Sequence, residues 1–146
     1  MELKITTRKS EESDFEYIYD ALCRLENQIL NREITLEIFN ENITNPNFLY
    51  LIAEINNEKA GFITFHTQKL MHHSGLVGEI EEFYVDAQYR SKGVGRELIT
   101  TIRSFAELKN LKSIEVTTNK RRTENVAIYQ SLGFNLSHNK FTIYRT

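Results

Sequence analysis

A strand-like run, a turn with two glycines and a long amphipathic helix follow one another between residues 78 and 109. The helix is predicted over 94–109 because apolar residues recur at the spacing of one helical face: Val94, Leu98, Ile102 and Phe105. A further strand-like run, SIEVTT at 113–118, comes directly after it. Two strands joined through a helix pair in parallel, so the chain must build a sheet that contains a helical crossover.

The remaining segments favour antiparallel pairing around this crossover. Strands are predicted at 2–7, 48–55 and 59–67, a loop at 68–76, and a closing pair of strands within 133–146. A helix that buries Phe15, Ile18, Leu22, Leu25 and Ile29, a second that carries Leu36, Phe39 and Ile43 before Pro46, and a helix at 123–132 complete the pattern. The sequence therefore predicts an α+β fold in a single domain, 1–146, with a mixed, mostly antiparallel sheet of six to seven strands and about four helices.

Composition excludes several classes of partner. The 18 basic and 20 acidic residues nearly balance, so no global charge favours nucleic acid or an anionic membrane. Cys23 is the single cysteine and cannot form an internal disulfide, which fits a reducing compartment. No apolar run of about 18 residues and no apolar leader stand in the sequence. We expect a soluble cytoplasmic protein with no nucleic-acid or membrane partner.

The glycine turn, RSKGVG at 90–95, has the features of an anion site. Glycines at the mouth of a helix let a phosphate approach the backbone, and the free N–H groups of the first turn can donate to it. The Walker pattern is absent, and a dinucleotide fingerprint would need a glycine where Leu98 stands. Taken alone, the turn indicates a bound anion or a turn without a ligand.

A second motif makes the pattern more specific. The sequence AIYQSLGF places Tyr129 in a helix that ends at Gly133 and Phe134. Together with EEFYV and the glycine turn, it resembles the GCN5-related N-acetyltransferase (GNAT) family, along essentially the whole chain. That resemblance implies the acyl-CoA N-acyltransferase fold, an acetyl-CoA-dependent enzyme and a cleft between the strands at 79–86 and 113–118. Members of this family are often dimeric, so the resemblance also makes a homodimer an expectation.

The resemblance assigns the co-substrate contacts. The pyrophosphate of acetyl-CoA would lie on the turn, and the pantetheine arm would pair with the backbone of the preceding strand. Many family members carry an asparagine where Arg122 stands, so Asn125 is carried over only as a nearby substitute. The expected contacts are Phe83, Val85, Arg90, Ser91, Lys92, Gly93, Val94, Gly95, Arg96 and Asn125.

Acetyl transfer to an amine needs a base for the ammonium proton and an acid for the leaving thiolate. The resemblance gives the acid role to Tyr129, whose alternative is an aromatic packing residue. For the base, regular alternation puts Glu79 and Glu81 on one face of the strand and Glu82 on the other, and a bulge would change that parity. We expect Glu79 to be the base, acting through water, with a surface or ion-paired carboxylate as the alternative for each of the three.

A narrower resemblance concerns the acceptor. Paired histidines ahead of Gly-Glu-Ile-x-Glu and a closing Ser-His-x-x-Phe-Thr resemble the aminoalkylphosphonate N-acetyltransferase branch, which is associated with a divalent metal. The matching residues are His72, His73, Gly78, Glu79, Ile80, Glu82, Ser137, His138, Phe141 and Thr142. We expect substrate contacts at His72, His73, Glu81 and His138, with loop histidines in solvent as the alternative and a bound metal left open. Further candidates for positive charge, each with a solvated surface residue as the alternative, are Lys69, Arg121, Arg122 and Lys140.

These patterns predict transfer of an acetyl group to the primary amine of a small molecule, with an aminoalkylphosphonate as the most specific substrate prediction. Two alternatives stay open. One is acetylation of another amine, such as a polyamine, an aminoglycoside or a protein N-terminus. The other is a non-catalytic acyl-CoA-binding module, which the tyrosine and the acidic strand disfavour. A cationic acceptor should be bound in an acidic pocket, whereas an anionic one needs basic groups.

Overall fold

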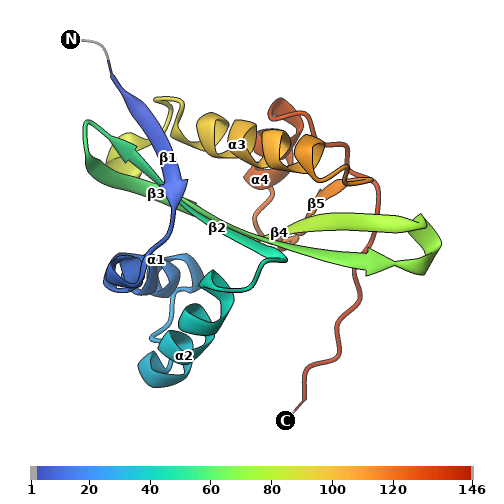
Figure 1. The fold of residues 1–146 in the computed structure, drawn as a ribbon, viewed down its shortest axis with the longest axis horizontal. Coiled ribbons are helices and arrows are strands. Elements are labelled where there is room, and N and C mark those ends of the chain that lie inside the picture. Colours follow the sequence, from blue (N-terminus) through green and yellow to red (C-terminus); the bar gives the residue numbers. More distant parts are fainter. Residues whose placement is uncertain (1–2, 146) are drawn as a thin grey trace.

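The computed structural model describes residues 3–145, which fold into a five-stranded sheet with helices on both faces (Figure 1). The strands lie in chain order: β1 (Ile5–Lys9), β2 (Phe48–Ile55), β3 (Glu58–Leu70), β4 (Gly75–Val85) and β5 (Ile114–Val116). The first four pair antiparallel, and β5 pairs in parallel with β4, as the crossover predicted. Residues 2 and 146, at the outer ends of two expected strands, lie outside the described residues.

The helices form two layers. In Figure 1, α1 (Phe15–Glu26) and α2 (Arg32–Ile43) lie below the sheet, and α3 (Val94–Leu108) and α4 (Glu124–Ser131) lie above it. Under α1 and α2 the core joins Phe15 and Phe39 to Phe62. Under α3 it joins Leu98 and Ile102 to sheet residues such as Ile63 and Phe65. The predicted α+β fold is confirmed, with five strands rather than six to seven.

The first helix ends earlier than the apolar spacing predicted. Asn27 adopts a left-handed conformation with φ of 53°, and its N–H closes the helix on the carbonyl of Arg24. Asparagine tolerates this conformation better than most residues, so it stops the helix. Ile29 is therefore 91% exposed, and its predicted place on the buried face is wrong.

The predicted loop at 68–76 is largely strand. The β3–β4 pairing continues through Gln68–Val77 to Leu70–Gly75, and only a short 3-10 turn, η2 (Met71–His73), separates the strands. Backbone pairing here outweighs the polar composition of the segment. Gly78 allows this close pairing, because a Cβ on it would lie 2.0 Å from the ring of Phe65.

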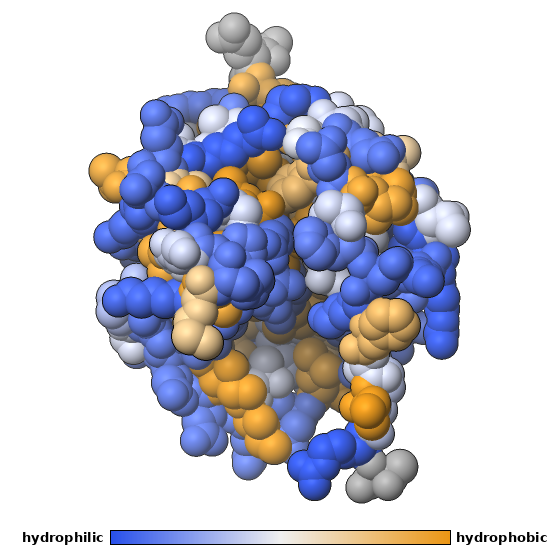
Figure 2. Space-filling view, turned by 90° about the vertical axis from the view of Figure 1, so that its right-hand side faces the viewer, coloured by the Kyte–Doolittle hydropathy of each residue, from blue (hydrophilic) through white to orange (hydrophobic). Residues whose placement is uncertain are grey.

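The predicted closing strands are absent from residues 135–145. Alternating apolar residues favour a strand, but a strand forms only where a neighbour takes its hydrogen bonds, and β5 is three residues long. The apolar side chains of the segment are instead exposed, and Phe141 is 93% exposed. In Figure 2 they give an orange patch at the lower right, beside a hollow in the surface.

A buried acid holds the N-terminal part of the chain to the sheet. Asp14 is fully buried at the end of the 3-10 turn η1 (Glu12–Asp14). Its carboxylate accepts two hydrogen bonds of 2.8 Å from the Arg8 guanidinium and one of 2.7 Å from the backbone N–H of Glu11, and Lys59 Nζ lies 2.8 Å away. Every part of this charge is thus compensated.

Candidate active site

A bulge in β4 sets the direction of its carboxylates. Thr64 pairs with Glu82 and Phe65 with Ile80, so Glu81 is an extra residue with no partner on β3. The bulge puts Ile80 on the α3 face, where it joins the core, and turns Glu79 and Glu82 together toward the α1–α2 face. The parity expected from regular alternation, which put Glu82 on the face opposite Glu79, is therefore wrong.

The sheet opens beside these carboxylates. Strands β4 and β5 pair only from Gly78–Ile114 to Ile80–Val116, so the later part of β4 has no neighbour on this edge among residues 3–145. The hydroxyl of Thr117 donates to Glu79 Oε2 across the opening, at 3.3 Å. Glu79 therefore lies at the point where the two strands separate.

Tyr129 comes to the same opening from α4. Its ring centroid lies 6.3 Å from that of Phe83 on β4 and 5.8 Å from that of Phe134. Burial raises the pKa of the Tyr129 hydroxyl above its ordinary value, and the positive charge of Arg122 opposes this rise. The phenol is thus protonated at neutral pH and can give a proton.

The position of Tyr129 depends on how α4 ends. Gly133 has φ of 100°, a left-handed conformation that glycine adopts without strain. The Arg103 guanidinium of α3 donates to the carbonyl of Leu132 at 2.7 Å and ties α4 to α3. Tyr129 and Phe134 also border a cavity of about 730 Å³ between α3, α4 and β5.

The pKa values of the other two carboxylates of β4 are raised above their ordinary value. Burial raises the pKa of Glu82, and the hydrogen bond from the Thr64 hydroxyl opposes the rise. Burial and the charges of Glu79 and Glu82 raise the pKa of Glu81. Three acids thus lie within four residues of one strand, and perturbed carboxylates of this kind are candidates for proton transfer.

The glycine turn has the conformation that an anion site needs. Gly93 has φ of 95° and precedes Val94, where α3 begins without a side-chain cap among the described residues. A Cβ at Gly95 would lie 3.2 Å from the ring of Phe83, so this glycine brings the helix mouth close to β4. The Arg90 side chain donates to the carbonyl of Val85 at 3.1 Å. The N–H groups of an uncapped first helical turn can bind a phosphate.

The remaining expected contacts of this turn, Ser91, Lys92 and Arg96, are exposed. Ser91 has a left-handed φ of 62° and turns the chain toward the helix. Asn125 donates to the Thr118 hydroxyl at 2.8 Å and so fixes the start of α4. The structure thus gives Asn125 a local structural role, and its contact with the co-substrate stays a prediction.

The three histidines predicted at the acceptor do not come together. The rings of His72 and His73 lie 4.4 Å apart, tilted by 52°, at the tip of the β3–β4 hairpin, and His73 lies 3.9 Å from Glu115. His138, in the C-terminal segment, contacts its neighbour Ser137. Among residues 3–145 no three His, Cys, Asp or Glu side chains gather into a group that could hold a metal ion. We therefore derive no step through a metal.

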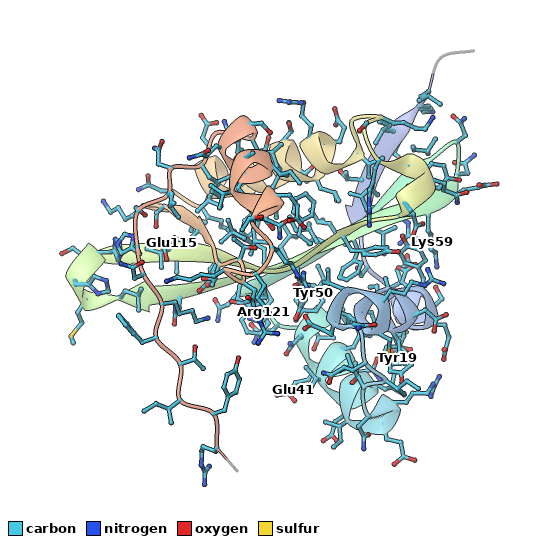
Figure 3. All side chains as sticks on the ribbon, turned by 180° about the vertical axis from the view of Figure 1, so that it is seen from behind. Tyr19, Glu41, Tyr50, Lys59, Glu115 and Arg121 are labelled. Atoms are coloured by element: carbon cyan, nitrogen blue, oxygen red, sulfur yellow. The ribbon has the colours of Figure 1, made fainter. Side chains whose placement is uncertain are left out.

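Sequence reasoning missed a polar chain on the α1–α2 face. Asn42 donates to the Tyr50 hydroxyl at 2.7 Å, and that hydroxyl lies 2.9 Å from His66 Nε2. His66 pairs with Glu79 across the strands, and burial lowers its pKa. In Figure 3, Tyr50 and Arg121 both lie below the sheet, on the side of α1 and α2. Polar residues in otherwise buried strands, such as His66, were the available signal.

These elements define an acyltransferase-type site, with an acidic strand and a tyrosine beside a glycine-mouthed helix. Residues 13–134 match the model of the acetyltransferase (GNAT) family, and the chain belongs to that family. It is an acetyl-CoA-dependent N-acetyltransferase. Among residues 3–145, no helix combines the length and apolar character needed to cross a membrane.

One curated relative and two solved structures are similar to this chain in sequence or in fold. The aminoalkylphosphonate N-acetyltransferase of Salmonella typhimurium is 29% identical over 135 residues, which cover 92% of this chain and 88% of that protein. A transcriptional regulator from Bacillus halodurans superposes with a TM-score of 0.88 at 21% identity, over 97% of this chain and 100% of that one. An aminoglycoside 6'-N-acetyltransferase from Acinetobacter baumannii gives 0.84 at 16% identity, over 98% and 99%. At identities of 21% and 16%, these two structures show the fold alone.

Proposed function

We propose that this enzyme transfers the acetyl group of acetyl-CoA to the primary amine of a small aminoalkylphosphonate. The observation that carries the substrate class is the likeness to the Salmonella typhimurium enzyme, which extends over 92% of the chain. The acidic segment of β4 supports an amine acceptor, because carboxylates attract an ammonium group and can take its proton.

The co-substrate would enter along the opening between β4 and β5. Its pyrophosphate would lie on the turn from Arg90 to Arg96, where α3 begins without a side-chain cap among the described residues. Its pantetheine arm would pair with the backbone of Phe83 and Val85, where it would replace the Arg90 side chain on the carbonyl of Val85. The short distance between Gly95 and Phe83 supports this path, because it makes the turn and the strand edge continuous.

Glu79 is the proposed base. It accepts the ammonium proton, directly or through a water molecule, and leaves a neutral amine. The amine nitrogen then attacks the thioester carbonyl, so that a C–N bond forms as the C–S bond breaks. The hydrogen bond from Thr117 supports this role, because it holds Glu79 at the opening without neutralising its charge.

Tyr129 is the proposed acid. As the C–S bond breaks, the phenol gives its proton to the departing thiolate of CoA, and the resulting phenolate takes up the second proton that the attacking nitrogen loses as it becomes an amide. Contact of the Tyr129 ring with Phe83 supports this assignment, because it keeps the tyrosine beside the strand along which the pantetheine would run. Its raised pKa keeps the proton available at neutral pH.

A thiol-release assay with acetyl-CoA and a panel of amines tests the proposal. We expect turnover of aminomethylphosphonate and 2-aminoethylphosphonate, each with its N-acetyl product identified by mass. Turnover of a polyamine, an aminoglycoside or a peptide N-terminus, with both phosphonates inert with and without a divalent metal, would refute the substrate. Acetyl-CoA binding without turnover of any amine would favour a binding module.

A further inference from the structure

The four basic residues considered as sources of charge for the acceptor have very different surroundings. Lys69 lies on the outer part of β3, and Lys140 lies on the C-terminal segment; both are exposed, as is Arg121. Arg122 alone is partly buried. It follows β5, on the loop that leads into α4.

The backbone holds Arg122 firmly at this place. Its N–H donates to the carbonyl of Asn119 at 2.9 Å, and its carbonyl accepts from the N–H of Asn125 at 3.0 Å. Its side chain then crosses from the β5 side of the molecule to α1, where the guanidinium donates to the carbonyl of Leu25 at 2.8 Å. Since α1 packs against β4, this bond links the loop after β5 to the helix layer that covers β4.

The guanidinium has capacity left for a ligand. Arginine carries five N–H donors, and the bond to Leu25 uses one of them. Within residues 3–145 no carboxylate lies at ion-pair distance from Arg122, unlike Arg8, which is paired with Asp14. A partly buried cation without a counter-ion is unfavourable, and an anionic ligand would relieve this cost.

The charges around the opening have a direction. Glu79, Glu81 and Glu82 lie along β4, whereas the Arg122 side chain starts beside Tyr129 on the loop after β5 and places its guanidinium at the end of α1. Carboxylates on the strand and a separate cation at the end of α1 match a zwitterion with its ammonium toward the carboxylates and its anion toward Arg122. A polyamine, which is cationic at both ends, would be repelled by the guanidinium.

We propose that Arg122 is the specificity-determining residue of the acceptor site and binds the phosphonate of the acceptor while its amine lies between Glu79 and Tyr129. This inference rests on the proposed function and adds the residue that reads the anion. A planar guanidinium suits two oxygens of a phosphonate, so lysine would replace it only in part.

The test compares Arg122→Gln and Arg122→Lys with Arg121→Gln, an exposed neighbour on the same loop. Each is assayed with 2-aminoethylphosphonate and with ethanolamine, which has the amine without the anion. We expect Arg122→Gln to raise the KM for the phosphonate about 10- to 100-fold, the range of a lost charge-assisted hydrogen bond, with little change for ethanolamine. Arg122→Lys should recover part of the loss, and Arg121→Gln should behave as wild type.

An equal loss for both acceptors would overturn the inference and make Arg122 a latch between α1 and the α4 loop. Methylphosphonate, which lacks an amine, gives a second readout on the unmodified enzyme: it should inhibit competitively against the acceptor. Absence of this inhibition would also count against Arg122 as an anion site. If wild type turns over neither phosphonate but acetylates a polyamine, the proposed function itself fails, a result visible before any variant is made.

Discussion

Two acidic regions of this molecule behave in opposite ways. Asp14 is fully buried, yet Arg8, Lys59 and a backbone N–H compensate its charge. The carboxylates of β4 are less buried, and their recorded partners are the hydroxyls of Thr64 and Thr117. The first region binds parts of the fold together, and the second is the one proposed to act on the substrate. Compensation of a buried charge, rather than burial alone, separates structure from function here.

The largest effect should follow from breaking the compensated region. Removing the charge of Asp14 in the Asp14→Asn variant leaves Arg8 and Lys59 without their shared counter-ion. We expect a loss of about 3–5 kcal/mol in the free energy of unfolding, measured by urea denaturation at neutral pH. Glu16→Gln, which removes an exposed ion pair with Arg32, is the matched control and should cost less than about 1 kcal/mol.

The pH dependence of this loss has a definite sign. The bonds from Arg8, Lys59 and the backbone N–H of Glu11 outweigh the effect of burial and hold the pKa of Asp14 below its ordinary value. Its contribution is present above the unfolded pKa of about 3.9 and is lost as pH falls through the folded value. The gap between wild type and Asp14→Asn should therefore close in acid. A gap that persists there would mean that the variant acts through packing.

The next largest effect concerns Tyr129, beside the opening between β4 and β5. Tyr129→Phe removes the phenol and keeps the ring packing against Phe83 and Phe134. We expect kcat to fall about 100-fold, the lower end of the range for a general acid, with acetyl-CoA affinity and unfolding free energy nearly unchanged. Steady-state kinetics with calorimetric titration of CoA would separate these quantities. Unchanged turnover would leave Tyr129 as a packing residue.

The smallest expected effect is the change in stability on replacing Glu82, and its sign is opposite to that expected for Asp14. Burial raises the pKa of Glu82, so the folded chain binds more protons than the unfolded chain between the ordinary value of about 4.3 and the raised one. Stability from this group therefore falls as pH rises through that window. Glu82→Gln keeps an acceptor for Thr64, and we expect neutral-pH stability to stay within about 1 kcal/mol of wild type or to rise. A loss as large as that of Asp14→Asn would erase the difference between the regions.

The sequence predicted the main elements because periodicity follows from local geometry. The buried face of α3, the parallel crossover and the β2–β3 hairpin all follow from apolar spacing and turn residues. The site of Tyr129 followed from a family resemblance rather than from periodicity.

Other features depend on contacts that no local pattern contains. The bulge at Glu81 arises from pairing with Thr64 and Phe65, which lie on another strand. The bond from Arg122 to Leu25 joins residues 97 positions apart. The closing strands failed for a related reason, since apolar alternation predicts a strand but does not supply a neighbour for it.

The kinetics of Glu79→Gln and Glu81→Gln, measured side by side from about pH 6 to pH 9, test the central claim most directly. The claim is that the under-compensated acid ahead of the bulge takes the proton of the acceptor. We expect kcat/KM of Glu79→Gln to fall about 100-fold or more and to lose its acidic limb, while Glu81→Gln changes less than about tenfold. An inactive Glu81→Gln beside a fully active Glu79→Gln would contradict the account.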